Sequence, residues 1–105
     1  MNKPKNNRKK AKTKSNWVEG SVQEFLQLSD ADMEYLEMRF AASRFLKTIR
    51  QAHNMTQEAA ALKLHTSQSR LAKMEAGDSS VSLDLLFKSL FSLGVSRKKL
   101  VEALG

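Results

Sequence analysis

Apolar side chains recur at intervals of three and four residues along much of the chain, the spacing that brings them to one face of an α-helix. The longest such pattern lies in residues 31–53, where neither Gly nor Pro interrupts it, and predicts one helix of about 22 residues. Its apolar positions are Tyr35, Leu36, Met38, Phe40, Phe45, Leu46 and Ile49. No run alternates between apolar and polar residues in the manner of a β-strand. The chain is therefore expected to be all-α.

Residues that cap helices divide the chain further. Ser21 with Glu24, and Ser29 with Asp32, have the spacing of a capping box, so a short helix is expected before the long one. Four more helices are expected to begin at Thr56, at Thr66 or Ser67, at Ser82 and at Ser96, with stops at Asn54, Gly77 and Gly94. Their inward positions are predicted to be Ala60, Ala61, Leu64, Leu71, Met74, Leu83, Leu86, Phe87, Leu90, Phe91, Leu100, Val101 and Leu104. The predicted architecture is a five-helix bundle with an extended N-terminal helix and a short helix before it.

The net charge of +7 on the 105 residues is distributed unevenly. Residues 1–15 contain no acid and hold seven bases, namely Lys3, Lys5, Arg8, Lys9, Lys10, Lys12 and Lys14. The remainder of the chain has equal numbers of acids and bases. Residues 1–16 are expected to be a disordered tail, and residues 17–105 a single domain. Such a tail is attracted to nucleic-acid phosphates whatever their sequence. The alternative is a solubilising terminus without a specific partner.

Composition also excludes several classes of protein. The chain has no cysteine, hence neither a disulfide framework nor a thiolate metal site, which fits a reducing cytoplasm. No apolar run is long enough for a membrane span or a secretory signal. His53 and His65 stand alone, and neither a nucleophile elbow nor a phosphate-binding glycine loop occurs. We therefore expect no catalytic residue, no metal and no cofactor, and a cytoplasmic protein that is not an enzyme.

The segment 67–76 has the side-chain pattern of a helix that fits the major groove of DNA. Leu71 and Met74 share the inward side of a helical wheel, and the opposite side carries Ser69, Ala72, Lys73 and Ala76, with Gln68 and Arg70 on the flanks. The outward side is narrow and polar, as a groove about 12 Å wide requires. The glutamine suits the adenine edge, and the lysine can donate to guanine or phosphate. Thr66 and Ser67 leave backbone amides for a phosphate. The alternative is an ordinary solvated helix surface.

The residues of this region resemble the helix-turn-helix of the phage Cro and repressor family, the XRE family. The resemblance covers about residues 45–95, with the motif at about 56–77, and rests on Thr56-Gln57, Ala61, Leu64, Ser67-Gln68-Ser69, Leu71, Met74-Glu75 and Gly77. It implies that Gln57 grips a phosphate, that Gln68 and Ser69 read base edges, and that Lys73 contacts a base one turn later. It also implies a structural pair between Arg50 and Glu75.

Two positions depart from the family pattern. His65 occupies the turn position that glycine usually holds, although histidine enters the left-handed region more readily than most residues. Asp78 follows the motif in a loop that often approaches phosphate, where an acid is unfavourable, although Ser79 and Ser80 could donate there. Neither departure overturns the resemblance, and both bear on the expected phosphate contacts.

The outer parts resemble HigA-like antitoxins, small XRE proteins encoded beside RelE-like toxins. This wider resemblance spans roughly residues 20–104 and rests on residues 20–29, 36–39 and 80–86. It implies a repressor of its own operon that also neutralises a partner ribonuclease, the RelE-like toxin. A homodimer on a palindromic operator in double-stranded DNA is expected on physical grounds, because one short recognition helix alone would bind weakly and two-fold symmetry doubles the contacts. The alternatives are a stand-alone phage-type repressor, or a toxin-binding protein with secondary or nonspecific nucleic-acid binding.

Two groups of residues outside the motif have open roles. The apolar residues Phe25, Leu28, Tyr35 and Leu36 could be buried against the body, form a dimer seam or bind the toxin. Arg97, Lys98 and Lys99 lie in the first turn of the last helix, where cations oppose the helix dipole. A nearby phosphate would offset that cost, and the alternative is a solvated face.

Overall fold

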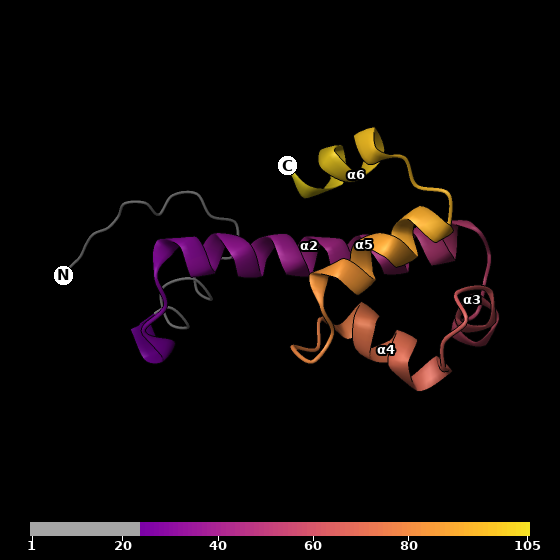
Figure 1. Ribbon diagram of the computed structural model, residues 1–105, viewed down its shortest axis with the longest axis horizontal. Coiled ribbons are helices and arrows are strands. Elements are labelled where there is room, and N and C mark those ends of the chain that lie inside the picture. Colours follow the sequence, from indigo (N-terminus) through magenta and orange to yellow (C-terminus); the bar gives the residue numbers. More distant parts are fainter. Residues whose placement is uncertain (1–23) are drawn as a thin grey trace. The chain divides into compact units, whose positions relative to one another are not determined.

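Helices make up most of residues 24–105, the part of the chain that the computed structural model describes (Figure 1). Residues 24–26 are helical, and five helices follow: α2 (Asp30–Ala52), α3 (Gln57–Lys63), α4 (Gln68–Ala76), α5 (Leu83–Ser92) and α6 (Arg97–Leu104). No β-strand occurs in the described residues, so the prediction of an all-helical, repressor-like bundle is confirmed. The basic tail and the partner Ser21 of the first predicted capping box lie outside the described residues.

A serine or threonine side chain begins each of the helices α3 to α6. The hydroxyl oxygens of Thr56, Ser67, Ser82 and Ser96 each accept a hydrogen bond from the backbone N–H three residues ahead, at 3.0–3.1 Å. Because the first N–H groups of a helix have no intrahelical acceptor, each such cap is worth about 1 kcal/mol. Of the two caps considered for α4, Ser67 is the one used.

The predicted capping box before α2 is present. The Ser29 hydroxyl accepts from the Asp32 N–H at 3.1 Å, and Asp32 Oδ2 accepts from the Ser29 N–H at 3.2 Å. The two side chains also share a hydrogen bond of 2.9 Å. An aspartate therefore performs the reciprocal role that glutamate or glutamine has in the common form of this motif.

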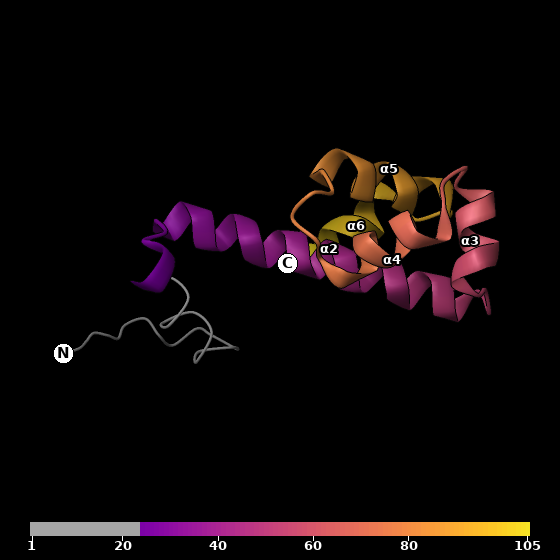
Figure 2. The same ribbon diagram turned by 90° about the horizontal axis from the view of Figure 1, so that it is seen from below.

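The described chain divides into two compact units, residues 24–36 and residues 37–105, and each is described by itself. The second unit contains the hydrophobic core, to which α2, α3, α4, α5 and α6 all contribute. The core consists of Ala42, Leu46, Ala60, Ala61, Leu71, Met74, Val81, Leu86, Leu90, Leu93, Val95 and Leu100. In the view of Figure 1, α5 lies between α6 above it and α4 below it, and in the view of Figure 2, turned by 90°, both α4 and α6 lie below α5.

Two predicted core positions are wrong. Phe91 is 42% exposed and Val101 is 68% exposed, although both were expected to face inward. The buried side of α5 is formed by Leu86, Ser89 and Leu90, and Phe91 lies about 100° further round the helix. Val101 follows the buried Leu100 in α6 and lies about 100° further round the helix, on its exposed side. The apolar spacing in these short helices was compatible with a wider buried face than the one that forms.

Two non-glycine residues end helical segments in the left-handed region, as expected. Asn54 follows α2 with φ 58°, and His65, at the position where glycine is usual, also has φ 58°. The His65 N–H donates to the Leu62 carbonyl at 3.2 Å, and the N–H of Thr66 donates to the Ala61 carbonyl at 2.9 Å. The turn before α4 is therefore formed with histidine in place of glycine.

Gly77 ends α4 at a point where both its dihedral angle and the available space favour glycine. Its φ is +78°, and a Cβ atom added there would lie 2.9 Å from Cδ1 of the Phe40 ring. Gly94 has a similar φ of +95°, but nothing lies within 4 Å of its added Cβ. Substitution of Gly94 therefore reports the cost of the backbone angle alone, whereas substitution of Gly77 reports that cost together with the cost of the contact with Phe40.

We expect Gly94→Ala to lower the free energy of unfolding by about 1 kcal/mol, the cost of a left-handed alanine. Gly77→Ala is expected to lower it by about 2 kcal/mol, because the Phe40 ring must also move. Denaturant unfolding measures both values. In a Phe40→Leu background the two costs are expected to become similar, whereas an unchanged difference would contradict a role for the ring.

Candidate nucleic-acid interface

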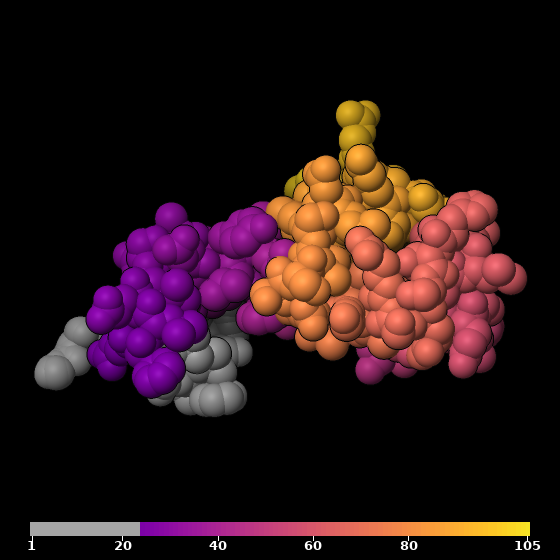
Figure 3. Space-filling view, turned by 60° about the horizontal axis from the view of Figure 1, so that its bottom comes forward, coloured from indigo at the N-terminus to yellow at the C-terminus, as the bar shows by residue number. Residues whose placement is uncertain are grey.

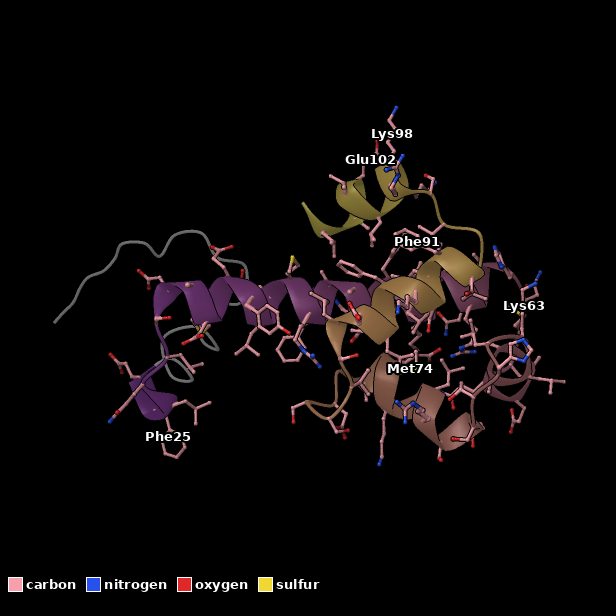
Figure 4. The ribbon with its side chains drawn as sticks, viewed as in Figure 1. Phe25, Lys63, Met74, Phe91, Lys98 and Glu102 are labelled. Carbon is pink, nitrogen blue, oxygen red and sulfur yellow. The ribbon has the colours of Figure 1, made fainter. Side chains whose placement is uncertain are left out.

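Helices α3 and α4 pack against each other and form one face of the second unit, with the α4–α5 loop beside them (Figure 3). Leu71 and Met74 are 0% and 1% exposed and fix α4 to the core. Figure 4 shows Met74 directed from α4 toward α5. The side chains of α4 on its other side therefore face outward, as the helical wheel predicted.

The residues predicted to contact DNA gather on this face. The exposed ones are Ser67, Gln68, Ser69, Arg70 and Lys73, and the half-buried ones are Gln57 and Thr66. Ala72, also half-buried, keeps the outward side of α4 narrow. The seven bases predicted for nonspecific phosphate contacts lie outside the described residues. α4 thus presents a short polar side with two cations, a shape and charge that suit the major groove.

A chain of side-chain hydrogen bonds runs from the outward face of α4 into the interior. Nε2 of Gln68 donates to Oε1 of Gln57 at 2.7 Å, and Nε2 of Gln57 donates to Oε1 of Glu75 at 3.1 Å. The same Glu75 oxygen accepts from Nη2 of Arg50 at 2.9 Å. Four residues from α2, α3 and α4 are thereby joined, two of them predicted to touch DNA and two predicted as a structural pair.

The inner end of this chain is a bidentate ion pair between Arg50 and Glu75. Besides the contact through Nη2, Nε of Arg50 donates to Oε2 of Glu75 at 2.5 Å, and the side chains are 11% and 4% exposed. The hydrogen bond to Glu75 raises the pKa of Arg50, although burial acts in the opposite direction. Nη1 of Arg50 also donates to the Met55 carbonyl at 2.9 Å. Arg50 therefore links α2 both to α4 and to the chain that leads into α3.

The arrangement leaves Gln68 equipped for one kind of contact. Its Nε2 uses one N–H on Gln57, so the second N–H and the carbonyl oxygen remain available on the exposed side. A free donor beside a free acceptor matches N7 and N6 of adenine in the major groove. Because Gln57 is itself held by Glu75, the Gln68 amide plane is oriented before any ligand arrives. Sequence reasoning selected both glutamines and did not predict the hydrogen bond between them.

A second buried arginine, which the sequence analysis missed, holds the loop between α4 and α5. Arg39 of α2 is 6% exposed, and its Nη1 and Nη2 donate to the carbonyls of Val81 and Asp78 at 2.6 and 3.0 Å. The available signal was its position on the buried stripe of α2, three and four residues before Ala42 and Ser43. A base on an apolar stripe indicates a buried hydrogen-bonding role.

Asp78, a departure from the family pattern, is used within its own loop. Its Oδ1 accepts from the Ser80 hydroxyl at 2.6 Å and from the Ser80 N–H at 2.8 Å. The hydrogen bond from the hydroxyl, followed by that from the backbone, lowers the pKa of Asp78. The Ser80 hydroxyl, which the sequence analysis considered as a phosphate donor, therefore donates to Asp78 instead.

Lys98 of α6 does not share the face formed by α3 and α4. Lys98 and Glu102 project from α6 on the side of this unit opposite α4 (Figure 4). Arg97, Lys98 and Lys99 are all exposed. A single straight duplex lying along α4 would therefore not reach Lys98.

We expect Arg50→Met to lower the free energy of unfolding by about 3 kcal/mol, because it leaves the buried Glu75 carboxylate without its cation. The exposed Arg44→Met in the same helix serves as a matched control and should change stability by less than about 0.5 kcal/mol. Adding Glu75→Met to Arg50→Met is expected to recover at least about 1 kcal/mol, since an apolar pair tolerates burial. Urea unfolding measures all four proteins, and equal effects of Arg50→Met and Arg44→Met would contradict the assignment.

The Asp78 carboxyl is expected to titrate below its usual value of 3.8, as followed by carboxyl carbon NMR. Because its pKa is lower in the folded than in the unfolded protein, it stabilises the fold above pH 3.8, and this contribution disappears as the pH falls through the folded pKa. Ser80→Ala removes the largest cause and should move the midpoint toward 3.8, whereas Ser79→Ala should not. Identical midpoints in the two variants would disprove the role of the Ser80 hydroxyl.

No group of three or more metal-ligating side chains occurs in residues 24–105. Among the same residues, none of the helices combines the length and apolar character needed to cross a membrane.

A family model described as Helix-turn-helix, HTH_3, matches residues 46–100, slightly more than half of the 105 residues. The match begins within α2, includes α3, α4 and α5, and ends within α6. No match was found among curated proteins or among solved structures. Members of this family are regulators that bind DNA and are typically not enzymes. The chain belongs to the helix-turn-helix family of the XRE type and is a DNA-binding transcriptional regulator.

Proposed function

We propose that this regulator is a repressor that reads a specific sequence in double-stranded DNA with α4 in the major groove. The observation that carries the proposal is the hydrogen-bonded chain from Gln68 through Gln57 to the buried Glu75. An exposed amide held in this way loses little conformational entropy on meeting a base, so its hydrogen bonds contribute more of their energy to recognition. Ser69 and Lys73 are the other base-reading residues of the proposal, and both are exposed on the same helix.

Phosphate contacts are assigned to residues around the base-reading ones. Thr66, Ser67 and Arg70 lie at the beginning of α4, where hydroxyl, guanidinium and backbone N–H groups can donate to phosphate oxygens. Gln57 is assigned a phosphate contact through the part of its amide that Gln68 and Glu75 do not use. The bases between Lys3 and Lys14 would add contacts that do not depend on sequence.

A homodimer on a palindromic operator is the assembly that we propose. α4 has nine residues, so one copy reaches only a few base pairs. Two copies related by a two-fold axis double the number of base contacts, with half-sites one helical turn apart, about 34–36 Å. Specific binding at physiological salt generally requires the larger interface that two copies provide.

The finer role that we propose is that of an autorepressing antitoxin with a RelE-like toxin as partner. Its support is the wider resemblance of residues 20–104 to HigA-like proteins. Co-expression with the product of a neighbouring toxin gene tests this role. A stand-alone phage-type repressor is the alternative, and it predicts no such complex.

Gln68→Ala is expected to weaken binding to the preferred duplex, selected from a random pool, by about 10- to 100-fold, because it removes a bidentate base contact. On scrambled DNA the same variant should lose less than about threefold, since phosphate contacts persist. Fluorescence anisotropy on both duplexes measures the effects. Lys88→Ala, an exposed change on α5, is the matched control and should alter neither affinity.

Gln57→Ala should weaken binding to the preferred duplex, and Gln57→Ala with Gln68→Ala should cost less than the sum of the two, because the residues act as a unit. Thermal unfolding of each variant separates loss of binding from loss of the fold. An equal loss on both duplexes for Gln68→Ala would contradict base reading. It would favour instead a nonspecific binder that acts through its basic tail.

A further inference from the structure

The first unit exposes three large apolar side chains. Phe25 is 84% exposed, Leu26 is 53% exposed and Tyr35 is 46% exposed. Figure 4 shows the Phe25 ring projecting outward from the helical turn at residues 24–26. These three apolar side chains lie within eleven residues of sequence, and the acids Glu24, Asp32 and Glu34 of the same segment are exposed as well.

The charge around these side chains has one sign. Between Lys14 and Arg39 the sequence contains no base and six acids, which are Glu19, Glu24, Asp30, Asp32, Glu34 and Glu37. On the surface of α2, Asp32 and Tyr35 are neighbours because they are three residues apart. Glu24, Phe25, Leu26, Asp32, Glu34 and Tyr35 are all exposed, and we refer to these exposed side chains of residues 24–35 together as the acidic aromatic patch. An occupant of this patch must carry positive charge and must also cover aromatic rings.

The chain itself contains a segment of that chemistry. Its basic tail has seven bases between Lys3 and Lys14 and no acid, so its charge is nearly equal and opposite to that of the acidic stretch that follows. Lysine and arginine stems cover apolar surface while their heads remain in water, and their cations are attracted to aromatic faces. The tail therefore matches both properties of the acidic aromatic patch.

The connection between the two segments is long enough for contact. Ten residue steps separate Lys14 from Glu24, which permits a span of up to about 35 Å. The α2 part of the patch, residues 32–35, extends about 5 Å along the helix axis. A connection of this length gives an effective concentration of about millimolar, so even a weak contact would be occupied.

We propose that residues 3–14 bind the acidic aromatic patch in the same molecule when DNA is absent, and that DNA phosphates compete with the patch for the same lysine and arginine side chains. Nonspecific DNA must then displace the tail from the patch, which lowers affinity for random sequence. A preferred operator gains its base contacts through α4. The tail therefore lowers affinity for the operator by the same factor as affinity for random sequence, or by a smaller factor. The competition rests on the proposed DNA binding, whereas the contact between tail and patch does not.

Paramagnetic relaxation in the full chain tests the contact directly. The sequence has no cysteine, so Asn7→Cys provides one site for a nitroxide label. At low salt we expect line broadening of the amide signals of residues 24–36, and its loss in 1 M salt, where the Debye length is about 3 Å. Replacing Glu24 and Glu34 by Gln and Phe25 and Tyr35 by Ala should remove more than about half of the effect. Glu102→Gln, an exposed acid on α6, is the control and should leave it unchanged.

Further samples distinguish the possible occupants. Mixing labelled chain without ¹⁵N with unlabelled ¹⁵N chain reveals whether the tail binds a second copy, and broadening there would overturn the intramolecular contact. Absence of broadening at low salt, or equal broadening in the four-residue variant, would overturn the proposal as well. A scrambled duplex is expected to abolish the broadening, and its persistence on DNA-bound protein would overturn the competition.

Affinity for the scrambled duplex gives an independent readout. Glu24→Gln with Glu34→Gln should tighten binding by about three- to tenfold at low salt, or about 0.7–1.4 kcal/mol. When Lys9, Lys10 and Lys12 are replaced by Gln, the same pair of changes should tighten binding by less than about twofold. Equal tightening in both backgrounds would mean that the acids repel DNA directly, and would overturn the competition. The effect of Gln68→Ala on operator preference tests only base reading by α4. It does not change how the measurements on the scrambled duplex are interpreted.

Discussion

The buried carboxylate of Glu75 is the group on which the geometry of this site depends. It accepts hydrogen bonds from Arg50 at 2.5 and 2.9 Å and from Gln57 at 3.1 Å, so three helices converge on one side chain. A carboxylate that is 4% exposed requires such compensation, because removal from water costs several kcal/mol. The same requirement fixes the relative placement of α2, α3 and α4. Stability and recognition thus share one polar contact, with Gln68 at its exposed end.

α2 positions two parts of the site through arginines on one face. Arg39 and Arg50 are eleven residues apart, close to three helical turns, so both point into the second unit. Arg50 holds α4 and the entry to α3, and Arg39 holds two carbonyls of the α4–α5 loop. Arginine suits both positions because its planar group donates several hydrogen bonds in fixed directions. The spacing of Arg39 and Arg50 along α2 therefore sets the separation between the beginning of the motif, at the entry to α3, and its end, at the α4–α5 loop.

Local signals in the sequence predicted the helices, their caps and the outward side of α4, because caps, turns and helical spacing depend on neighbouring residues. Thr56, Ser67 and Ser82 begin helices as expected, and His65 takes the left-handed angle that its turn requires. Phe91 and Val101 were misplaced because the width of a buried face is decided by packing between helices, which spacing alone does not reveal. The bonds of Arg39 to Val81 and Asp78 join residues about forty positions apart, so no local pattern contained them.

The link between Gln68 and Gln57 has a consequence for how such regulators diverge. A new side chain at position 68 must meet a different base edge and also satisfy the Gln57 carbonyl, which now accepts a hydrogen bond at 2.7 Å. A replacement that fits only the new base edge leaves the Gln57 side-chain carbonyl without its hydrogen-bond donor. Divergence toward another operator should therefore proceed by coupled replacement at positions 57 and 68, while Arg50 and Glu75 stay constant behind them. In the mode of base reading proposed above, the unit of specificity is the pair of glutamines rather than either residue alone.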